Sequence, residues 1–263
     1  MDKKQYTVSE HYIPKCYLKN FSIREGEDYF TYCLFNKSNV PKWLNIKNIC
    51  VVNDLYELEI FGEYVDRNDI EDGFIDIETR YDNFFRNVIA NIDKHENIIL
   101  SPENFELIRN FCSLMVFRSK YMIEALANFG EYVADCHPAD LSQIRNITKD
   151  IDPAAVENEI IPYVNKCYAY SIAYNLISKM LDTQSLSPEV QNYKSALGEH
   201  YCFLYSADRG FITSDVPVVN LYGEPAECLG FDDFMCFPLS TNCCIAFLED
   251  NKFNGQVINI TKD

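Results

Sequence analysis

Apolar side chains recur every three or four positions through the middle of the chain, which is the spacing of one face of an α-helix. From Asp66 onward the recurring residues are Ile70, Phe74, Ile77, Tyr81, Phe84, Val88 and Ile92. After a helix-start signal at Ser101-Pro102-Glu103, they are Phe105, Ile108, Cys112, Met115, Met122, Leu126, Phe129 and Val133. The spacing predicts two long helices, over 66–92 and 101–133, that pack antiparallel.

The chain that follows also favours helices. A short helix is predicted over 138–146, and Asp152-Pro153 begins a longer one. Pro162 is expected to kink or split that helix before it continues to Leu181, because proline removes a backbone hydrogen bond and clashes with the preceding turn.

Both ends of the chain favour strands. Residues 29–35 are rich in aromatic and β-favouring types and follow a polar turn, and a second strand is expected over 49–52. Near the other end, short apolar runs are separated by Gly, Pro, Asp and Asn. The strands predicted there are 200–205, 211–213, 234–239, 243–248 and the segment from 257 onward.

These elements predict an α+β fold. A mixed or antiparallel sheet built from the N- and C-terminal segments is expected to pack against a central helical bundle. No internal repeat or flexible linker is visible, so one domain is expected over 1–263. Its parts are a β-rich segment 1–62, a helical segment 66–183 and a β-rich segment 200–263.

Composition narrows the possible partners. The 263 residues are 48% hydrophobic and carry a formal net charge of -17. This charge disfavours duplex nucleic acid as a partner, because binding to a phosphate backbone depends on Lys and Arg. A locally basic cleft, or metal ions held by carboxylates, could still accommodate a phosphate.

The eleven cysteines are an odd number, and they are scattered inside apolar runs without a CxxC pair, with Cys243-Cys244 as the one adjacent pair. We interpret them as small core residues in a reducing compartment. The N-terminus lacks an apolar signal region, and the longest uncharged apolar stretch, 111–117, is too short to span a bilayer. A cytoplasmic protein without a membrane segment is therefore expected.

The most distinctive motif is His11-Tyr12-Ile13-Pro14-Lys15-Cys16-Tyr17-Leu18-Lys19-Asn20-Phe21. It resembles the HYVPxxYLxxF opening of a bacterial family of unknown function, domain of unknown function 4238, and Ile13 in place of Val is the one departure. The resemblance implies a family and no particular reaction.

Further stretches follow the family pattern in order along the chain. They are Asn53-Asp54-Leu55-Tyr56, the acid-rich helix with Glu71 and Glu78, Phe211-Ile212-Thr213-Ser214-Asp215-Val216-Pro217 and Phe237-Pro238-Leu239-Ser240. The last two resemble the family's FxTSDxPV and PLS segments. Val216 stands where Asn is common in relatives, and Met115 stands where many relatives have Gln.

Arg118 is the clearest anomaly in the apolar pattern. Leu107, Phe111 and Leu114 form a stripe whose next member is a guanidinium. A buried cation needs an acidic partner, and losing that partner typically costs about 3–5 kcal/mol. Glu78 and Asp215 are the candidate partners. A structural ion pair and an anion-binding role are both open for Arg118.

The other candidate residues also have two interpretations each. His11 is either a hydrogen-bonded residue that fixes the turn before Pro14, or a base or metal ligand. Glu71, Glu78 and Asp82 share one helix face, which is either a solvated surface or a place to hold a divalent cation. Asp215 either forms a turn or pairs with Arg118, or it has a catalytic or metal-binding role.

Two functions follow from these candidates. The first is a hydrolase acting on a phosphodiester or similar anionic substrate. In it His11 serves as base or ligand, Glu78 and Asp215 as ligands of a divalent metal ion or as base, and Arg118 as the anion clamp. The second is a noncatalytic binding or regulatory module, with a protein partner, in which the same four residues form a buried polar network.

Overall fold

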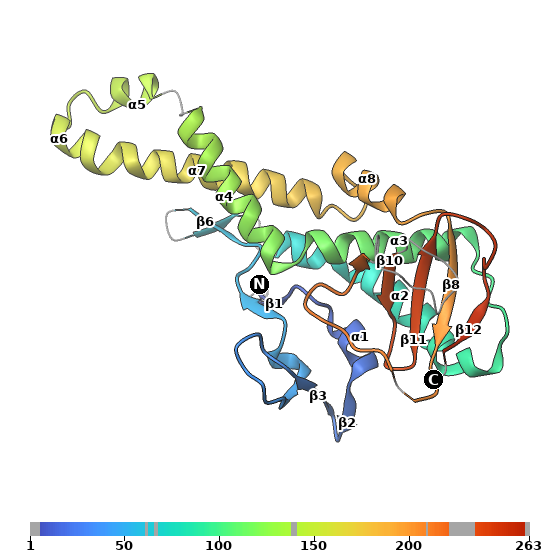
Figure 1. Cartoon of the computed structure of the whole chain (residues 1–263). Coiled ribbons are helices and arrows are strands. Elements are labelled where there is room, and N and C mark those ends of the chain that lie inside the picture. Colours follow the sequence, from blue (N-terminus) through green and yellow to red (C-terminus); the bar gives the residue numbers. More distant parts are fainter. Residues whose placement is uncertain are drawn as a thin grey trace, which may run out of the picture.

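Helices from the middle of the chain lie between small sheets built from its two ends, and the helices of residues 120–180 extend away from those sheets (Figure 1). The structure, a computed structural model, describes residues 6–60, 63–65, 68–137, 141–208, 210–220 and 235–260. This arrangement confirms the predicted α+β class.

The N-terminal part forms short strands around one helical turn. Its elements are β1 (Ser9–His11), α1 (Lys15–Leu18), β2 (Ile23–Glu25), β3 (Asp28–Cys33), β4 (Lys42–Asn45), β5 (Val51–Asn53), β6 (Leu58–Ile60) and β7 (Glu63–Val65). β1 pairs with β5, β6 pairs with β7, and β2, β3 and β4 form an antiparallel three-stranded sheet. The strands predicted over 29–35 and 49–52 correspond to β3 and β5.

The central helices are α2 (Asp69–Asn91), α3 (Pro102–Phe117), α4 (Lys120–Cys136), α5 (Ser142–Ile147), α6 (Pro153–Ala155), α7 (Ile161–Met180) and α8 (Pro188–Ala196). α2 confirms the first predicted helix, and α2 and α3 run in opposite directions (Figure 1). The interruption predicted near Pro162 is a π-helical turn, Val156–Ile160, directly before α7. Pro162 has no backbone N–H, so it cannot donate to the carbonyl four residues earlier, which lies within this turn.

The prediction of one helix over 101–133 is wrong, because the chain breaks between α3 and α4. Ser119 has an extended backbone, with φ -60° and ψ 144°, and its side chain accepts a hydrogen bond from the Met122 N–H. This cap starts a new helix in a new direction. α4 then packs along α7, where Gly130 lies so close that an added Cβ would be 2.9 Å from the Ala169 carbonyl oxygen.

The C-terminal strands form one mixed sheet in the order β12-β8-β11-β10-β9. They are β8 (His200–Tyr205), β9 (Val219–Asn220), β10 (Met235–Pro238), β11 (Cys243–Leu248) and β12 (Val257–Asn259). β12 runs parallel to β8, and the other pairs are antiparallel. Within the described residues, this sheet and the N-terminal sheets are separate.

The strand predicted over 211–213 is wrong. This segment joins no ladder, although its aromatic and β-branched residues favour a strand. It is fixed instead by single contacts, since the Phe211 N–H donates to the Thr241 carbonyl and the Thr213 hydroxyl bonds to Tyr17.

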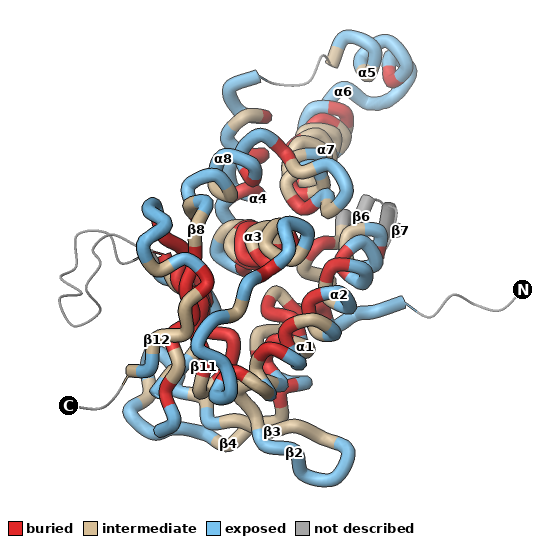
Figure 2. The backbone as a smooth tube through the Cα atoms, turned by 90° about the vertical axis from the view of Figure 1, so that its right-hand side faces the viewer, coloured by how far each residue is buried: buried red, intermediate tan, exposed pale blue. Residues whose placement is uncertain are grey.

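The C-terminal sheet is buried on both faces (Figure 2). On one face Phe203, Phe237 and Ile245 pack with α2 and α3, where the Tyr81 and Phe111 rings stack at 3.9 Å. On the other face Cys202, Leu204 and Ala246 form a second hydrophobic cluster. Cys243 and Cys244 lie in different clusters, as expected for neighbours on a strand.

The cysteines in the described part of the chain are all unpaired. Among the same residues, no helix has both the length and the apolar character that crossing a membrane requires.

Candidate functional site

The opening motif is mainly a packing element. Ile13, Tyr17 and Leu18 are buried in the main core, and Tyr17 stacks on Phe237 of β10 with ring centroids 5.0 Å apart. The Tyr17 hydroxyl and the Thr213 hydroxyl are 2.7 Å apart. The motif therefore connects the N-terminal strands to the C-terminal sheet.

Replacing Tyr17 by Phe is expected to lower the free energy of unfolding by about 1 kcal/mol, because one partly buried hydrogen bond to Thr213 is lost. Thr213→Val should lower it by a similar amount. The double variant is expected to be little worse than either single variant, because both changes remove the same bond. Urea unfolding of the four proteins measures this, and strictly additive losses would show that the two hydroxyls do not interact.

Arg118 lies directly after α3, where the break before α4 directs its side chain toward β1 and α2. Its guanidinium donates from Nη1 to Glu78 Oε1 at 2.7 Å and from Nη2 to the His11 carbonyl oxygen at 2.5 Å. Nε donates to the Tyr56 hydroxyl at 3.4 Å, and the group lies 3.9 Å from the centre of the Phe74 ring. Arg118 is 2% exposed, so the buried cation has protein partners on several sides.

A second acid stands near the same guanidinium. Glu71 Oε2 is 3.9 Å from Arg118 Nη2, and it accepts no hydrogen bond from the described residues. Burial raises the pKa of Glu71 to about 6, although the charge of Arg118 acts against this rise. Cys16 of α1 lies near the acidic face of α2 that carries Glu78 and Asp82. Burial, followed by the charges of Glu78 and Asp82, raises the pKa of the Cys16 thiol to about 12.

A buried carboxyl group next to this site was not predicted from the sequence. Glu10 of β1 is fully buried and accepts a hydrogen bond from the Tyr56 N–H at 2.9 Å. Asn68, at the N-terminus of α2 with a positive φ of 68°, donates to Glu10 at 3.4 Å and to Glu57 at 3.2 Å. Burial is the main cause that raises the pKa of Glu10 to about 8, and the hydrogen bond with Glu57 adds to it. Glu10 is therefore a buried carboxyl group next to a second acid, Glu57, and its raised pKa favours the protonated form.

The His11 side chain has a structural contact. Its Nε2 lies 3.3 Å from the Ile46 carbonyl oxygen. Burial, with the nearby charges of Lys15 and Arg118, lowers the pKa of His11 to about 4. The imidazole is therefore neutral at pH 7 and donates from Nε2, while the backbone carbonyl of the same residue accepts from Arg118.

Asp215 lies apart from this network. It is exposed in the segment after Thr213, and the titratable groups that its charge influences are Tyr12 and Cys50. The structure thus brings His11, Glu78 and Arg118 together, and no contact links Asp215 to them in the described part of the chain. Across the described residues, no group of three or more His, Cys, Asp or Glu side chains has an arrangement that could hold a metal ion.

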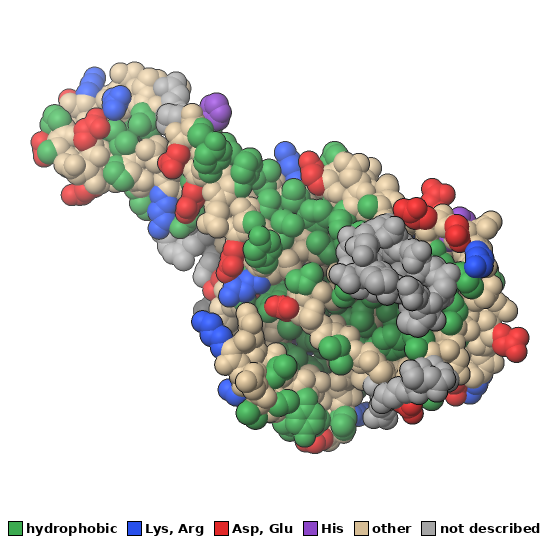
Figure 3. Space-filling view, viewed as in Figure 1, with side chains coloured by type: hydrophobic (Ala, Val, Ile, Leu, Met, Phe, Trp, Pro, Cys, Tyr) green, Lys and Arg blue, Asp and Glu red, His purple; other side chains and the backbone are tan. Residues whose placement is uncertain are grey.

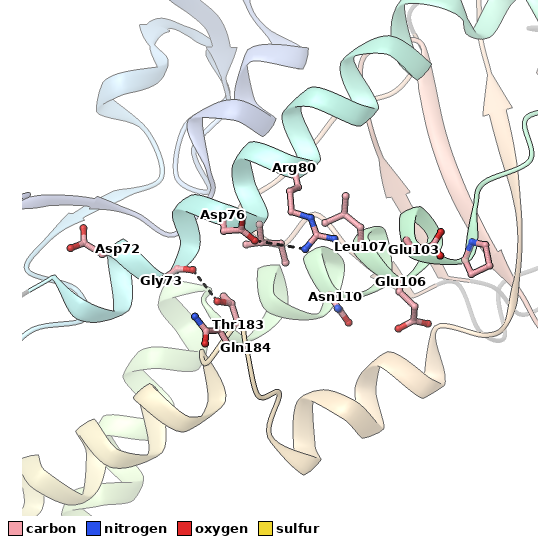
Figure 4. Close-up of a pocket in the computed structure, with 12 residues that line it drawn as sticks. Asp72, Gly73, Asp76, Arg80, Glu103, Glu106, Leu107, Asn110, Thr183 and Gln184 are labelled. Atoms are coloured by element: carbon pink, nitrogen blue, oxygen red, sulfur yellow. Dashed lines mark hydrogen bonds and ion pairs between the residues drawn. The ribbon is translucent and has the colours of Figure 1, made fainter.

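A cavity of about 570 Å³ lies on another side of α2, between α3 and the segment after α7 (Figure 4). The charged groups that line it are Asp72, Asp76, Arg80, Glu103 and Glu106. Arg80 pairs with Asp76 at 3.7 Å, and the Thr183 hydroxyl donates to the Gly73 carbonyl. The excess of carboxylates makes this cavity unfavourable for an anion.

The fold and this network define an α+β protein whose N-terminal segment is tied to its central helices by a buried arginine. The chain belongs to the family described as Protein of unknown function (DUF4238), whose model matches residues 10–260. This match confirms the resemblance seen in the opening motif. Comparison with curated proteins and with solved structures gives no match.

Proposed function

We propose that this protein is a noncatalytic binding or regulatory module, in which Arg118 joins the N-terminal segment to the central helices. The observation that carries the proposal is the burial of the guanidinium. Each of its three nitrogens donates to the protein itself, toward Glu78, the His11 carbonyl and Tyr56. A clamp for an anionic substrate needs donors that face the substrate.

The surroundings of Arg118 support the same conclusion. Glu71 and Glu78 lie beside the Arg118 guanidinium, and an incoming phosphate would meet their negative charge. The neutral His11 imidazole is already bonded to a backbone carbonyl. We refer to Arg118, Glu78, Tyr56 and the His11 carbonyl as the Arg118 lock.

The hydrolase with a phosphodiester or similar anionic substrate is the second candidate. One observation favours it, since the Glu71 and Glu78 side chains are 23% and 27% exposed. A divalent cation could therefore reach their carboxylates from solvent. In that case these two acids, rather than Asp215, are the ligands to test.

A turnover assay separates the two candidates. The purified protein, with millimolar Mg²⁺ or Mn²⁺ and bis(p-nitrophenyl) phosphate, is expected to release nitrophenol no faster than buffer containing the same metal. Glu78→Gln serves as the site variant, and Glu25→Gln on the exposed strand β2 is the matched control. Turnover that falls about 100-fold or more in folded Glu78→Gln, but not in Glu25→Gln, would establish the hydrolase instead.

A further inference from the structure

Two cysteines lie together on the outer face of the C-terminal sheet. β10 and β11 are antiparallel neighbours, with Cys236 opposite Ala246 and Pro238 opposite Cys244. Side chains alternate along a strand, so all four belong to one face, and Cys236 and Cys244 are diagonal neighbours on it. Figure 2 shows the sheet to one side of α2 and α3, so this face points away from the main core. In Figure 3, hydrophobic side chains lie at the surface where Figure 1 places β11.

The two thiols form a hydrogen bond with each other but differ in their surroundings. Cys244 is 1% exposed, and its thiol has a second acceptor in the Ile245 carbonyl oxygen at 3.5 Å. Cys236 is only partly buried. The hydrogen bond with Cys244 lowers the pKa of the Cys236 thiol. Burial, followed by the same hydrogen bond, raises the pKa of Cys244.

The neighbouring cysteines of the sheet lack this arrangement. Cys202 of β8 lies on the same face, on the far side of Ala246 from Cys236, and burial raises its pKa to about 12. Cys243 faces the main core, and burial raises its pKa as well. A redox-sensor thiol has a low pKa, is accessible to solvent and stands next to a second thiol that can resolve it. Cys236 beside Cys244 meets this description.

We propose that Cys236 and Cys244 are a redox-sensitive pair, which hydrogen peroxide converts to a reversible disulfide. The Cys236 sulfur attacks one peroxide oxygen, so an S–O bond forms, the O–O bond breaks and one water leaves. The Cys244 sulfur then attacks the Cys236 sulfur. The S–S bond forms, the S–O bond breaks, and the hydroxyl group leaves with the Cys244 proton as a second water. The two thiols lose two electrons in total, and the peroxide gains them.

The disulfide ties β10 to β11 across the hairpin that joins them. Diagonal neighbours on one face have α-carbons about 7–8 Å apart, and a disulfide spans up to about 7 Å, so the two strands close slightly when it forms. Transient disulfides of this kind occur in reducing compartments, where thiol reductants restore the pair. The pair lies on the sheet face opposite to α2 and α3, so this inference goes beyond the binding role of the Arg118 lock and does not depend on it.

Thiol counting by mass spectrometry tests the inference on the wild-type protein. The reduced protein, unfolded in urea, should take up eleven N-ethylmaleimide groups, one for each cysteine. After the folded protein has reacted with one equivalent of hydrogen peroxide, it should take up two fewer and weigh about 2 Da less before labelling, because two hydrogens leave. Dithiothreitol should restore the full count. Peptide mapping should find Cys236 joined to Cys244.

Two variants separate this pair from the other thiols. Cys202→Ala, on the same face, is the matched control and should still lose two thiols. Cys244→Ala should form no disulfide and should retain a sulfenic acid at Cys236 that dimedone labels. The inference fails if peroxide removes fewer than two thiols from the wild type, if the mapped disulfide joins other cysteines, or if Cys202→Ala prevents it. Because the mapping uses the wild type, the test does not depend on how well the variants fold.

Discussion

Arg118→Met is expected to lower the free energy of unfolding by about 3–5 kcal/mol, which for a chain of this size corresponds to a fall in melting temperature of roughly 10 °C. The methionine fills similar space but leaves Glu78, the His11 carbonyl and the Tyr56 hydroxyl without their donor. Arg118→Lys is expected to be nearly as harmful, because one ammonium cannot replace three directed nitrogens. Urea and thermal unfolding measure both losses.

The control for this prediction is Arg80→Met on α2. Arg80 also pairs with an acid, Asp76 at 3.7 Å, but its side chain is 57% exposed. Such surface pairs contribute about 0–1 kcal/mol, so Arg80→Met should unfold close to the wild type. If Arg118→Met were as stable as Arg80→Met, the guanidinium would not be holding the structure together.

Glu10→Gln is expected to stabilise the protein at pH 8, and the gain should shrink toward pH 5. The Glu10 pKa is about 8 in the folded protein against 4.5 for a free carboxyl, so the folded state holds a proton that the unfolded state releases. The contribution of this group is therefore complete below about pH 4.5 and is lost as pH rises toward 8, at about 1.4 kcal/mol per pH unit. Glutamine copies the protonated acid and does not titrate.

Unfolding curves at pH 5, 6, 7 and 8 give the slope for wild type and variant. Glu71, whose pKa is about 6, also lowers the free energy of unfolding as the pH rises to 6. Above pH 6 the difference between Glu10→Gln and wild type therefore reports on Glu10. Glu25→Gln, on the exposed strand β2, should follow the wild-type slope. A gain for Glu10→Gln that is the same at every pH would contradict the raised pKa of Glu10.

Elements with a clear hydrophobic pattern and turn residues at their ends could be predicted from the sequence. β8 and β11 match their predicted ranges because each is a continuous apolar run bounded by turn residues, buried on both sides. The break between α3 and α4 was missed because the apolar spacing continues through it. The available signal was Ser119, a preferred N-cap residue, directly after a buried Arg118.

The candidate site could be predicted in part. A guanidinium in an apolar stripe requires an acid, and Glu78 is at 2.7 Å as named. Asp215 was named on the basis of a strand at 211–213 that does not form, and among the described residues the acids near Arg118 are Glu71 and Glu78. Glu10 gave no signal, because a three-residue strand has no measurable period and its partner Asn68 is 58 positions away.

The most direct test of the Arg118 lock is a double-mutant cycle between Arg118→Met and Glu78→Met, followed by urea unfolding. The Arg118 lock predicts that the double variant regains part of the stability lost in Arg118→Met, because the second change removes the carboxylate left without its cation. Losses that simply add, with no coupling between the two positions, would contradict the claim that the Arg118–Glu78 ion pair holds the Arg118 lock together.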